Sequence, residues 1–256
     1  MSLEAVLFDL GGTLLHYHDP HTTDHQRHFR RITQQGFTDL LDALRERGFD
    51  LPADSSLLGK LDEKIRDNYL ADVKELRGGS IETPMRAALA EQGIDLSDNV
   101  WHDVRDAFYQ RIDEIVSPRI GLVETLTELN AHYKLGIISN TYWAGKLHDR
   151  HLAAYDLLDF FPVRVYSSDS PYMKPHPGIF ELALGALDTV PEQAAYVGDR
   201  LDVDIGGAQG VGMKGVLIHS PYRSEEFDGP PPEDITPDAV IDELPELPAA
   251  LRAWEG

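Results

Sequence analysis

Asp9 is the residue of this sequence with the clearest capacity for chemistry. It ends a short apolar run that begins at Ala5, and Gly11 and Gly12 follow it. A buried strand of this kind carries its last side chain to the carboxyl edge of a sheet, where open α/β sheets bind ligands, and glycines let the backbone approach a ligand closely. A carboxylate there can attack phosphorus or carbon and form a covalent intermediate. We therefore predict Asp9 as a catalytic nucleophile, with a helix-capping or turn carboxylate as the alternative.

Hydroxyl and amide groups stand at comparable positions. Ser139 ends the apolar run that begins at Leu135, and Asn140 follows it. A hydroxyl group and backbone N–H groups at a strand end suit a phosphate oxygen, although Ser-Asn is also ordinary turn chemistry. Thr13 is four residues beyond Asp9 and could orient that carboxylate or cap the next segment. We predict Ser139 as a catalytic residue that binds phosphate, and Thr13 and Asn140 as substrate-binding residues.

A lysine in a proline-rich loop can supply the positive charge that a phosphoryl group needs. Lys174 is followed by Pro175-His176-Pro177, and Pro177 can begin a helix at its first position. A lysine that is held rigidly can pair with both the nucleophile and the phosphoryl group. A single lysine is more often a solvated surface residue, but the Lys-Pro-x-Pro context argues against that interpretation. We predict Lys174 as a catalytic residue.

Two further carboxylates, Asp199 and Asp204, follow the apolar run that ends at Gly198. If Asp9 and Asp199 follow neighbouring strands, their carboxylates offer hard oxygen ligands at one edge of the sheet. Mg²⁺ takes one or two carboxylates together with water and phosphate oxygens. Asp204 could hold a metal-bound water or the lysine from a greater distance. We predict a Mg²⁺ site formed by Asp9, Asp199 and Asp204.

These residues must be positioned by a sheet, because most of them follow short and almost continuously apolar runs. Such runs are typical of parallel strands that are covered on both faces, and helical patterns such as Gly121–His132 and Pro177–Leu187 lie between most of them. The alternation predicts an α/β fold with a doubly wound parallel sheet. The predicted strands are Ala5–Asp9, Leu135–Ser139, Val163–Tyr166, Ala195–Gly198, Gly215–Ile218 and Ala239–Ile241.

The stretch from about Tyr17 to Ser117 interrupts this alternation. It contains no convincing strand, and its apolar residues recur at the spacing of helices. We predict about four helices, inserted after the first strand, that form a cap over the ligand-binding edge of the sheet. Residues 1–16 and 117–256 are then the core domain, and residues 17–116 are the helical cap domain.

Composition excludes several classes of function. The 256 residues carry a net charge of −21 and include no cysteine, which excludes disulfides, zinc–thiolate sites and thiol nucleophiles. The negative charge argues against a nucleic-acid partner, whereas a metal ion and local cations can still neutralise a small phosphorylated substrate. The sequence has neither an apolar stretch of ~20 residues nor a leader before the first strand, so we expect a cytoplasmic protein without membrane association. Oligomeric state is not predicted.

The order and spacing of these motifs resemble the haloacid dehalogenase superfamily, and the long helical insert resembles its helical-cap subclass. The motifs are Asp9-x-Gly-Gly-Thr, Ser139, Lys174-Pro-x-Pro, and Gly198-Asp199 with Asp204 behind it. The resemblance implies a Rossmann-like core in which Asp9 is the nucleophile, Ser139 binds phosphate, Lys174 stabilises charge and Asp199 binds Mg²⁺. It also implies that the main-chain carbonyl of Gly11 is a metal ligand.

One position departs from the pattern of the family. Phosphatases of the superfamily usually carry a second aspartate where this chain has Gly11, and that aspartate protonates the leaving alcohol and then activates water. General acid–base help of this kind is worth ~10²–10⁴-fold in rate. Its absence implies a substrate with a good leaving group, such as an acyl phosphate or an anomeric sugar phosphate, or a substitute for the acid, or slow turnover.

Histidines after the first motif are candidates for that substitute. His16, Tyr17, His18 and His21 follow Leu15 closely and are the candidates by position, and histidine can transfer protons near neutral pH. We hypothesise that His16 or His18 faces the substrate, and we predict His18 as a substrate-binding residue. The alternative is that this segment is a polar hinge into the cap.

The function that these observations predict is Mg²⁺-dependent, phosphatase-like hydrolysis of a small phosphorylated metabolite through an aspartyl-phosphate intermediate. Three alternatives stay open. A metal-free 2-haloacid dehalogenase also uses an aspartate and a lysine, but it has no reason to keep Asp199 and Asp204. A phosphonate hydrolase also has a small residue at the position of Gly11, and it would use a cap lysine. A non-catalytic binding or regulatory protein could keep the fold without the acid.

Overall fold

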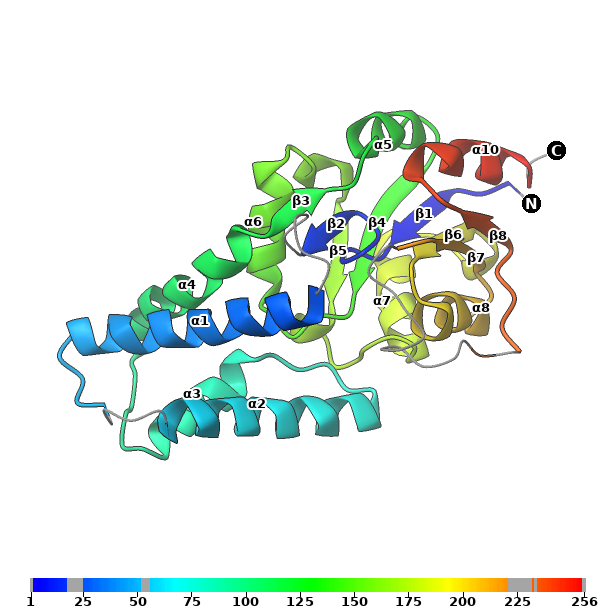
Figure 1. The fold of residues 1–256 in the computed structure, drawn as a ribbon. Helices are drawn as coiled ribbons and strands as arrows, with labels where there is room; N and C mark the ends of the chain where they lie inside the picture. Colours follow the sequence, from blue (N-terminus) through cyan, green and yellow to red (C-terminus); the bar gives the residue numbers. More distant parts are fainter. Residues whose placement is uncertain (1, 18–24, 52–55, 221–231, 233, 255–256) are drawn as a thin grey trace.

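The computed structural model describes residues 2–17, 25–51, 56–220, 232 and 234–254 (Figure 1). Its centre is a six-stranded sheet with the order β5-β4-β1-β6-β7-β8, in which every neighbouring pair is parallel. The strands are β1 (Ala5–Phe8), β4 (Lys134–Ser139), β5 (Val163–Tyr166), β6 (Ala194–Gly198), β7 (Lys214–Ile218) and β8 (Ala239–Ile241). The predicted parallel sheet and its six strands are confirmed.

Side chains of the central strand alternate between two apolar cores, one on each face of the sheet. In β1, Val6 and Phe8 belong to one core and Ala5 and Leu7 to the other, and all four are fully buried. Because both faces are covered, the strand needs no polar side. The first core is covered by α5 (Leu122–Asn130), α6 (Gly145–Ala154) and α10 (Leu247–Arg252), and the second by α7 (Pro177–Ala186) and α8 (Gly207–Gly210). Short helical turns lie at Leu158–Phe160, Ser167–Asp169, Pro191–Gln193, Leu201–Gly206 and Leu244–Glu246.

In the part of the chain that the structure describes, four helices between the first strand and residue 114 pack around an apolar core of their own. They are α1 (His25–Glu46), α2 (Ser56–Glu75), α3 (Glu82–Ala90) and α4 (Asp98–Asp113), which matches the predicted number. α1 packs against α4, where the rings of Phe37 and Phe108 stack with centroids 5.0 Å apart, and α2 packs against α3. These helices extend away from the sheet (Figure 1). Across the described residues, no helix combines the length and apolar character needed to cross a membrane.

A two-stranded antiparallel ribbon joins this helical insert to the sheet. β2 (Leu15–Tyr17) pairs with β3 (Val116–Pro118). The prediction that no strand lies between about Tyr17 and Ser117 is therefore wrong at both ends of that stretch. Strands of three residues are too short to show an alternating pattern, and their pairing joins parts of the chain that are far apart. The ribbon is where the chain leaves the sheet and returns to it.

The connection between α2 and α3 docks on the loop that precedes Lys174. The backbone N–H of Gly78 donates to the carbonyl of Pro171 at 3.1 Å, and that of Met173 donates to the carbonyl of Leu76 at 3.1 Å. These bonds leave no room for a side chain at Gly78. The helical insert is therefore fixed to the sheet domain directly beside the candidate catalytic lysine.

We predict that Gly78→Ala destabilises the protein, because the new β-carbon would lie 1.9 Å from the carbonyl oxygen of Ser170 and 2.2 Å from that of Ser167. The free energy of unfolding in urea should fall by about 2 kcal/mol or more. Gly59→Ala in α2 is the matched control, since nothing lies within 4 Å of its β-carbon, and it should raise that free energy by about 0.5–1 kcal/mol. Equal effects of the two substitutions would contradict the docking.

Candidate active site

A buried ion pair between Asp9 and Lys174 lies at the carboxyl ends of the strands. Asp9 follows β1, and its backbone N–H donates to the carbonyl of Val197 at 2.8 Å, which continues the pairing of β1 with β6. Lys174 Nζ lies 2.6 Å from Asp9 Oδ1 and 2.8 Å from Asp204 Oδ1. The side chains of Lys174 and Asp204 are each only 1% exposed. Water screens such contacts little, so they hold these groups far more firmly than an exposed ion pair would.

The side chain of Asn140 holds the backbone of Lys174 on both sides. Asn140 Nδ2 donates to the carbonyl of Lys174 at 2.8 Å, and the backbone N–H of Lys174 donates to Asn140 Oδ1 at 2.7 Å. Asn140 directly follows β4, so this reciprocal pair ties the lysine loop to the end of a central strand. The structure brings Asn140 into the site through the lysine, and its contact with substrate stays a prediction.

Tyr196 also supports Lys174, and the sequence did not predict this role. Lys174 Nζ donates to the hydroxyl of Tyr196 at 2.7 Å, and that hydroxyl donates to the carbonyl of Ile138 at 2.6 Å. A buried tyrosine hydroxyl normally finds such partners. The available signal was a single polar-tipped residue inside the otherwise apolar strand β6.

Asp199 completes a cluster of three buried carboxylates with Asp9 and Asp204. One oxygen of each residue lies within 4.8 Å of the others. Gly12 makes room for Asp199, because its φ is +89° and a β-carbon on it would lie 2.4 Å from Asp199 Oδ2. Gly198 makes room for Asp204 in the same way, with a β-carbon that would lie 2.4 Å from Asp204 Oδ2. The structure thus brings the three predicted carboxylates together.

The carboxylates of this cluster oppose one another's ionisation. The pKa of Asp9 is raised to about 7, chiefly because the group is buried; Lys174 lowers it, and the charges of Asp204 and Asp199 raise it further. Burial by itself would lower the pKa of Lys174, but the carboxylates of Asp204 and Asp9 outweigh burial and raise it. The lysine therefore stays charged, whereas the nucleophile needs more positive charge nearby to ionise fully.

The donor set fits a divalent cation. Mg²⁺ prefers oxygen ligands, and a cation beside Asp9 and Asp199 would relieve the repulsion that raises the pKa of Asp9. Both oxygens of Asp204 have protein partners, since Oδ1 lies beside Lys174 and Oδ2 accepts a hydrogen bond from the backbone N–H of Arg200 at 3.0 Å. Asp204 therefore supports the lysine, and Asp9 and Asp199 are better placed to hold a metal.

The predicted phosphate-binding hydroxyls lie on the strands and loops of the same edge. Ser139 ends β4, which neighbours β1, and it is buried. Thr13 is fully buried, and its hydroxyl has no hydrogen-bond partner among the described residues. A buried hydroxyl without a partner is costly, so this one suits a ligand oxygen. Arg119, which the sequence analysis missed, fixes the loop by donating to the carbonyl of Gly12 at 3.1 Å.

Of the histidines considered as proton carriers, His16 is described and His18 and His21 lie outside the described residues. His16 lies in β2, where burial, together with the charge of Arg119, lowers its pKa to about 4. Its neutral form is therefore favoured near pH 7, which argues against a role as the protonated acid of the reaction. The roles of His16 and His18 stay predictions.

A buried network lies beside Gly11, and the sequence did not predict that it joins Tyr17 to His148 and Thr141. The ring of Tyr17 covers Gly11, on which a β-carbon would lie 3.6 Å from Tyr17 Cδ2. The hydroxyl of Tyr17 lies 2.8 Å from His148 Nδ1, and His148 Nε2 lies 2.7 Å from Thr141 Oγ1. Burial lowers the pKa of His148 to about 3, so this histidine is also neutral at pH 7. The network links the ribbon to the loop after β4.

Known proteins resemble this chain along most of its length. The family model of haloacid dehalogenase-like hydrolases matches residues 3–212. A Methanopyrus kandleri protein named glyceraldehyde 3-phosphate phosphatase is 34% identical over 258 residues, which cover 98% of this chain and 97% of that protein. A Pyrococcus furiosus protein of the same name is 40% identical over 40% of this chain and 41% of its own length. Pyrophosphatase PpaX of Bacillus mycoides is 32% identical over 58% of this chain and 66% of its own length, so these two matches span less than two thirds of those proteins.

Solved structures share the fold at lower identity. A 2-haloacid dehalogenase from Pseudomonas syringae has a TM-score of 0.69 at 24% identity, over 98% of this chain and 99% of its own. A HAD phosphatase from Thermococcus onnurineus has a TM-score of 0.57 at 24% identity, over 97% and 98%. Since the family model covers most of the chain and a relative matches it almost from end to end, this protein belongs to the haloacid dehalogenase-like hydrolases.

Proposed function

We propose that this protein is a Mg²⁺-dependent phosphatase that acts on a small phosphorylated metabolite through an aspartyl-phosphate intermediate. The observation that carries the proposal is the cluster of Asp9, Asp199 and Asp204 with Lys174 buried among them. The names of the relatives from Methanopyrus and Bacillus, a glyceraldehyde 3-phosphate phosphatase and a pyrophosphatase, support phosphoryl chemistry. A cytoplasmic location and the absence of nucleic-acid and membrane partners remain predictions from the sequence.

In the proposed reaction, a carboxylate oxygen of Asp9 attacks phosphorus and the bond from phosphorus to the leaving oxygen breaks. Lys174 stays beside Asp9 and neutralises charge on the phosphoryl oxygens. Water then attacks the aspartyl phosphate, which regenerates the carboxylate and releases inorganic phosphate. Asp9, Asp199 and the carbonyl of Gly11 would hold Mg²⁺, which supplies further positive charge when bound. Asp204 holds the lysine in place.

The remaining predicted residues bind the phosphoryl group or the substrate. The hydroxyls of Ser139 and Thr13 would accept or donate hydrogen bonds at the phosphoryl oxygens. Asn140 acts first through the lysine backbone and can offer its second amide proton to substrate. His18 stays a predicted substrate-binding residue.

A 2-haloacid dehalogenase is the second candidate, because solved enzymes of that name share this fold. The same aspartate and lysine would serve it, since carbon can replace phosphorus as the site of attack. A metal-free dehalogenase reaction, however, gives no role to Asp199, whose carboxylate lies in one cluster with that of Asp9. Release of chloride from 2-chloropropionate without Mg²⁺ would favour it over the phosphatase.

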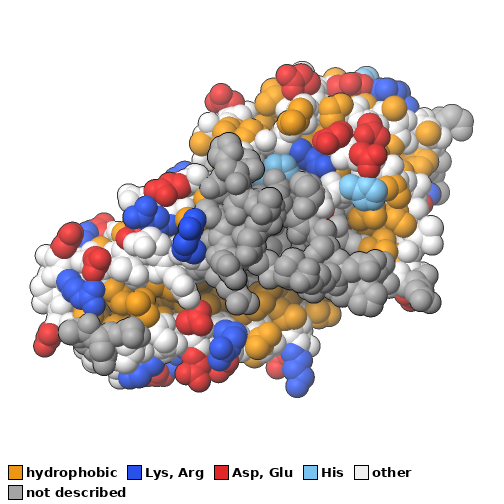
Figure 2. Space-filling model, in the orientation of Figure 1, with side chains coloured by type: hydrophobic (Ala, Val, Ile, Leu, Met, Phe, Trp, Pro, Cys, Tyr) orange, Lys and Arg blue, Asp and Glu red, His pale blue; other side chains and the backbone are white. Residues whose placement is uncertain are grey.

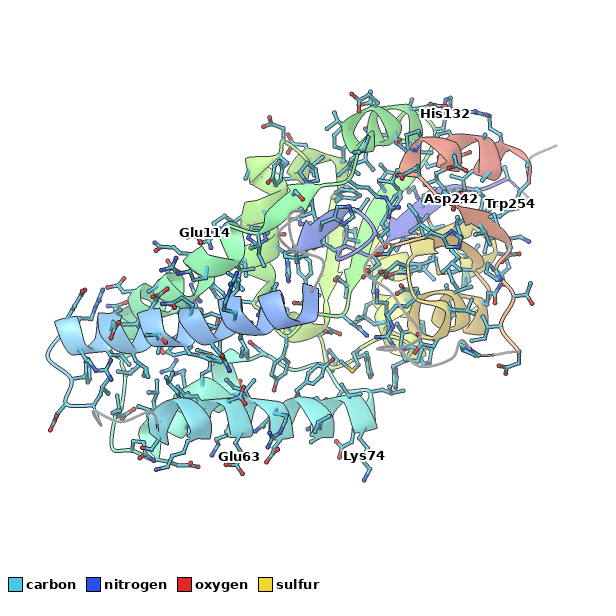
Figure 3. The ribbon with its side chains drawn as sticks, in the orientation of Figure 1. Glu63, Lys74, Glu114, His132, Asp242 and Trp254 are labelled. Atoms are coloured by element: carbon cyan, nitrogen blue, oxygen red, sulfur yellow. The ribbon has the colours of Figure 1, made fainter. Side chains whose placement is uncertain are left out.

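A phosphonate hydrolase would need a cap lysine at the substrate, and the described lysines of the insert are directed elsewhere. Lys60 donates to Gln92 Oε1 at 3.0 Å, and Lys64 pairs with Glu91, both on or next to α3. Lys74 points away from α1 on the outer face of α2 (Figure 3). These contacts leave the phosphatase as the better assignment.

We predict that Asp9→Asn abolishes Mg²⁺-dependent phosphate release from acetyl phosphate, with a loss of about 10³-fold or more in kcat. The amide has almost the shape of the carboxylate but cannot attack phosphorus. Asp202→Asn is the matched control, because Asp202 is exposed and pairs with Arg200 outside the cluster. It should keep activity within about twofold of the unsubstituted protein. Turnover that persists in Asp9→Asn would exclude Asp9 as the nucleophile.

We predict that Mg²⁺ stabilises the protein at pH 8 independently of any substrate. The pKa of Asp9 is raised on folding to about 7, so its contribution to stability is complete below pH ~4 and is lost as pH rises to ~7. A cation bound beside the cluster reverses that loss. At a concentration of 100 times its Kd, the cation adds about 2.7 kcal/mol to the free energy of unfolding. Thermal unfolding with and without Mg²⁺ measures the rise in Tm that the cation causes. Asp199→Asn should remove this rise. An equal shift in Asp199→Asn would place the metal elsewhere.

A further inference from the structure

A cavity of about 570 Å³ lies between α1, α2 and the loop that follows β4. α2 presents Asp62, Ile65 and Tyr69 to it, three residues that helical spacing places on one face. Glu63 and Lys74 lie on the outer face of the same helix and point away from α1 (Figure 3). The inner face of α2 therefore forms one wall of the cavity, and the cavity separates this face from α1.

The walls of this cavity are mainly apolar and aromatic. The rings of Tyr69 and Tyr142 pack edge to face, with their centroids 5.4 Å apart. Trp143 and Phe37 line the same space, and hydrophobic side chains are visible along the groove between α1 and α2 (Figure 2). A cavity of this size and lining is typical of sites for flat organic groups, and it is larger and more apolar than a three-carbon polyol requires.

The cavity adjoins the site of phosphoryl transfer through one shared residue, Asn140. Asn140, which holds both backbone groups of Lys174, also lines the cavity, and Thr141 stands next to it. Ser139, proposed to bind the phosphoryl group, directly precedes them. The wall is fixed, because the backbone N–H of Ile81 donates to the carbonyl of Tyr142 at 2.7 Å. A phosphomonoester bound at Asp9 would thus lie close to these aromatic walls.

The described residues beside Asp9 favour a leaving group that needs no proton. Gly11 has no side chain, and the ring of Tyr17 covers it. His16 and His148 are neutral at pH 7. A phenol is a far stronger acid than an alkyl alcohol, because its anion is delocalised into the ring. Its oxygen can therefore depart as phenolate, whereas an alkoxide cannot.

We propose that the substrate is an aryl phosphate, a phosphomonoester whose leaving oxygen is attached to an aromatic ring, and that Tyr69, Tyr142 and Trp143 receive that ring. This proposal rests on the phosphatase activity proposed above. An Asp9 oxygen bonds to phosphorus while the bond from phosphorus to the aryl oxygen breaks, and the electron pair leaves on that oxygen. The phenolate takes a proton from water. A second water attacks the aspartyl phosphate and releases inorganic phosphate and the free carboxylate.

The experiment compares kcat/KM for 2-naphthyl phosphate, phenyl phosphate, glycerol 3-phosphate and acetyl phosphate in the presence of Mg²⁺. The two aryl esters have leaving groups of similar acidity but different ring area, so their ratio reports contacts in the cavity. We expect 2-naphthyl phosphate to be preferred over phenyl phosphate by about tenfold and glycerol 3-phosphate to be the poorest substrate. Tyr69→Ala, which removes a wall, and Ile65→Trp, which fills the cavity, should each bring the ratio of the two aryl esters close to one.

Leu70→Ala is the matched control, because Leu70 is adjacent to Tyr69 on α2 and is 57% exposed. It should leave the ratio at its original value. A ratio near one in the unsubstituted protein, a ratio that neither cavity variant changes, or faster turnover of glycerol 3-phosphate than of phenyl phosphate would each overturn the assignment of an aryl substrate. In those cases, turnover of acetyl phosphate would leave the proposed phosphatase function standing. No phosphate release from any of the four compounds would overturn both.

Discussion

The contact of Lys174 with the carboxylates of Asp9 and Asp204 is the interaction on which the rest of the site depends. Removing a lysine and two carboxylates from water costs several kcal/mol per ion, and close, well-directed contacts are needed to offset that cost. Three separate segments meet to make them: the ends of β1 and β6 and the loop before α7. Asn140 and Tyr196 fix the lysine at that meeting point. Removing the lysine would leave the two buried carboxylates without the positive charge that they share.

The same requirement explains how the helical insert relates to the sheet. Its α2–α3 connection hydrogen-bonds to the loop that carries the lysine, and Ile81 bonds to the loop after β4. The segments that position the charged groups therefore also set the wall of the apolar cavity. Charge is concentrated on the phosphoryl side of the site, while the side toward α2 is mainly apolar. This division fits a substrate with an anionic end and a flat, apolar end.

Much of this arrangement could be predicted because the signals are local. Each strand of the parallel sheet is a short apolar run. Asp9 and Asp199 follow such runs directly, and Ser139 ends one. The ribbon, Arg119 and the network of Tyr17 with His148 could not be predicted, because they join residues far apart in the chain through short segments without periodicity. The clamp of Asn140 on the lysine backbone is non-local in the same way. In the structure Asn140 contacts the lysine backbone, and its contact with substrate stays a prediction.

The role of Asp9 is tested most directly by mass spectrometry of protein that is quenched in acid during turnover of acetyl phosphate with Mg²⁺. We predict one added phosphoryl group, located on the peptide that contains Asp9, which disappears when the substrate is exhausted. A phosphoryl group on a different residue would contradict the assignment of Asp9 as the nucleophile. So would rapid phosphate release without phosphorylated protein at any time after mixing, because water would then attack the substrate directly.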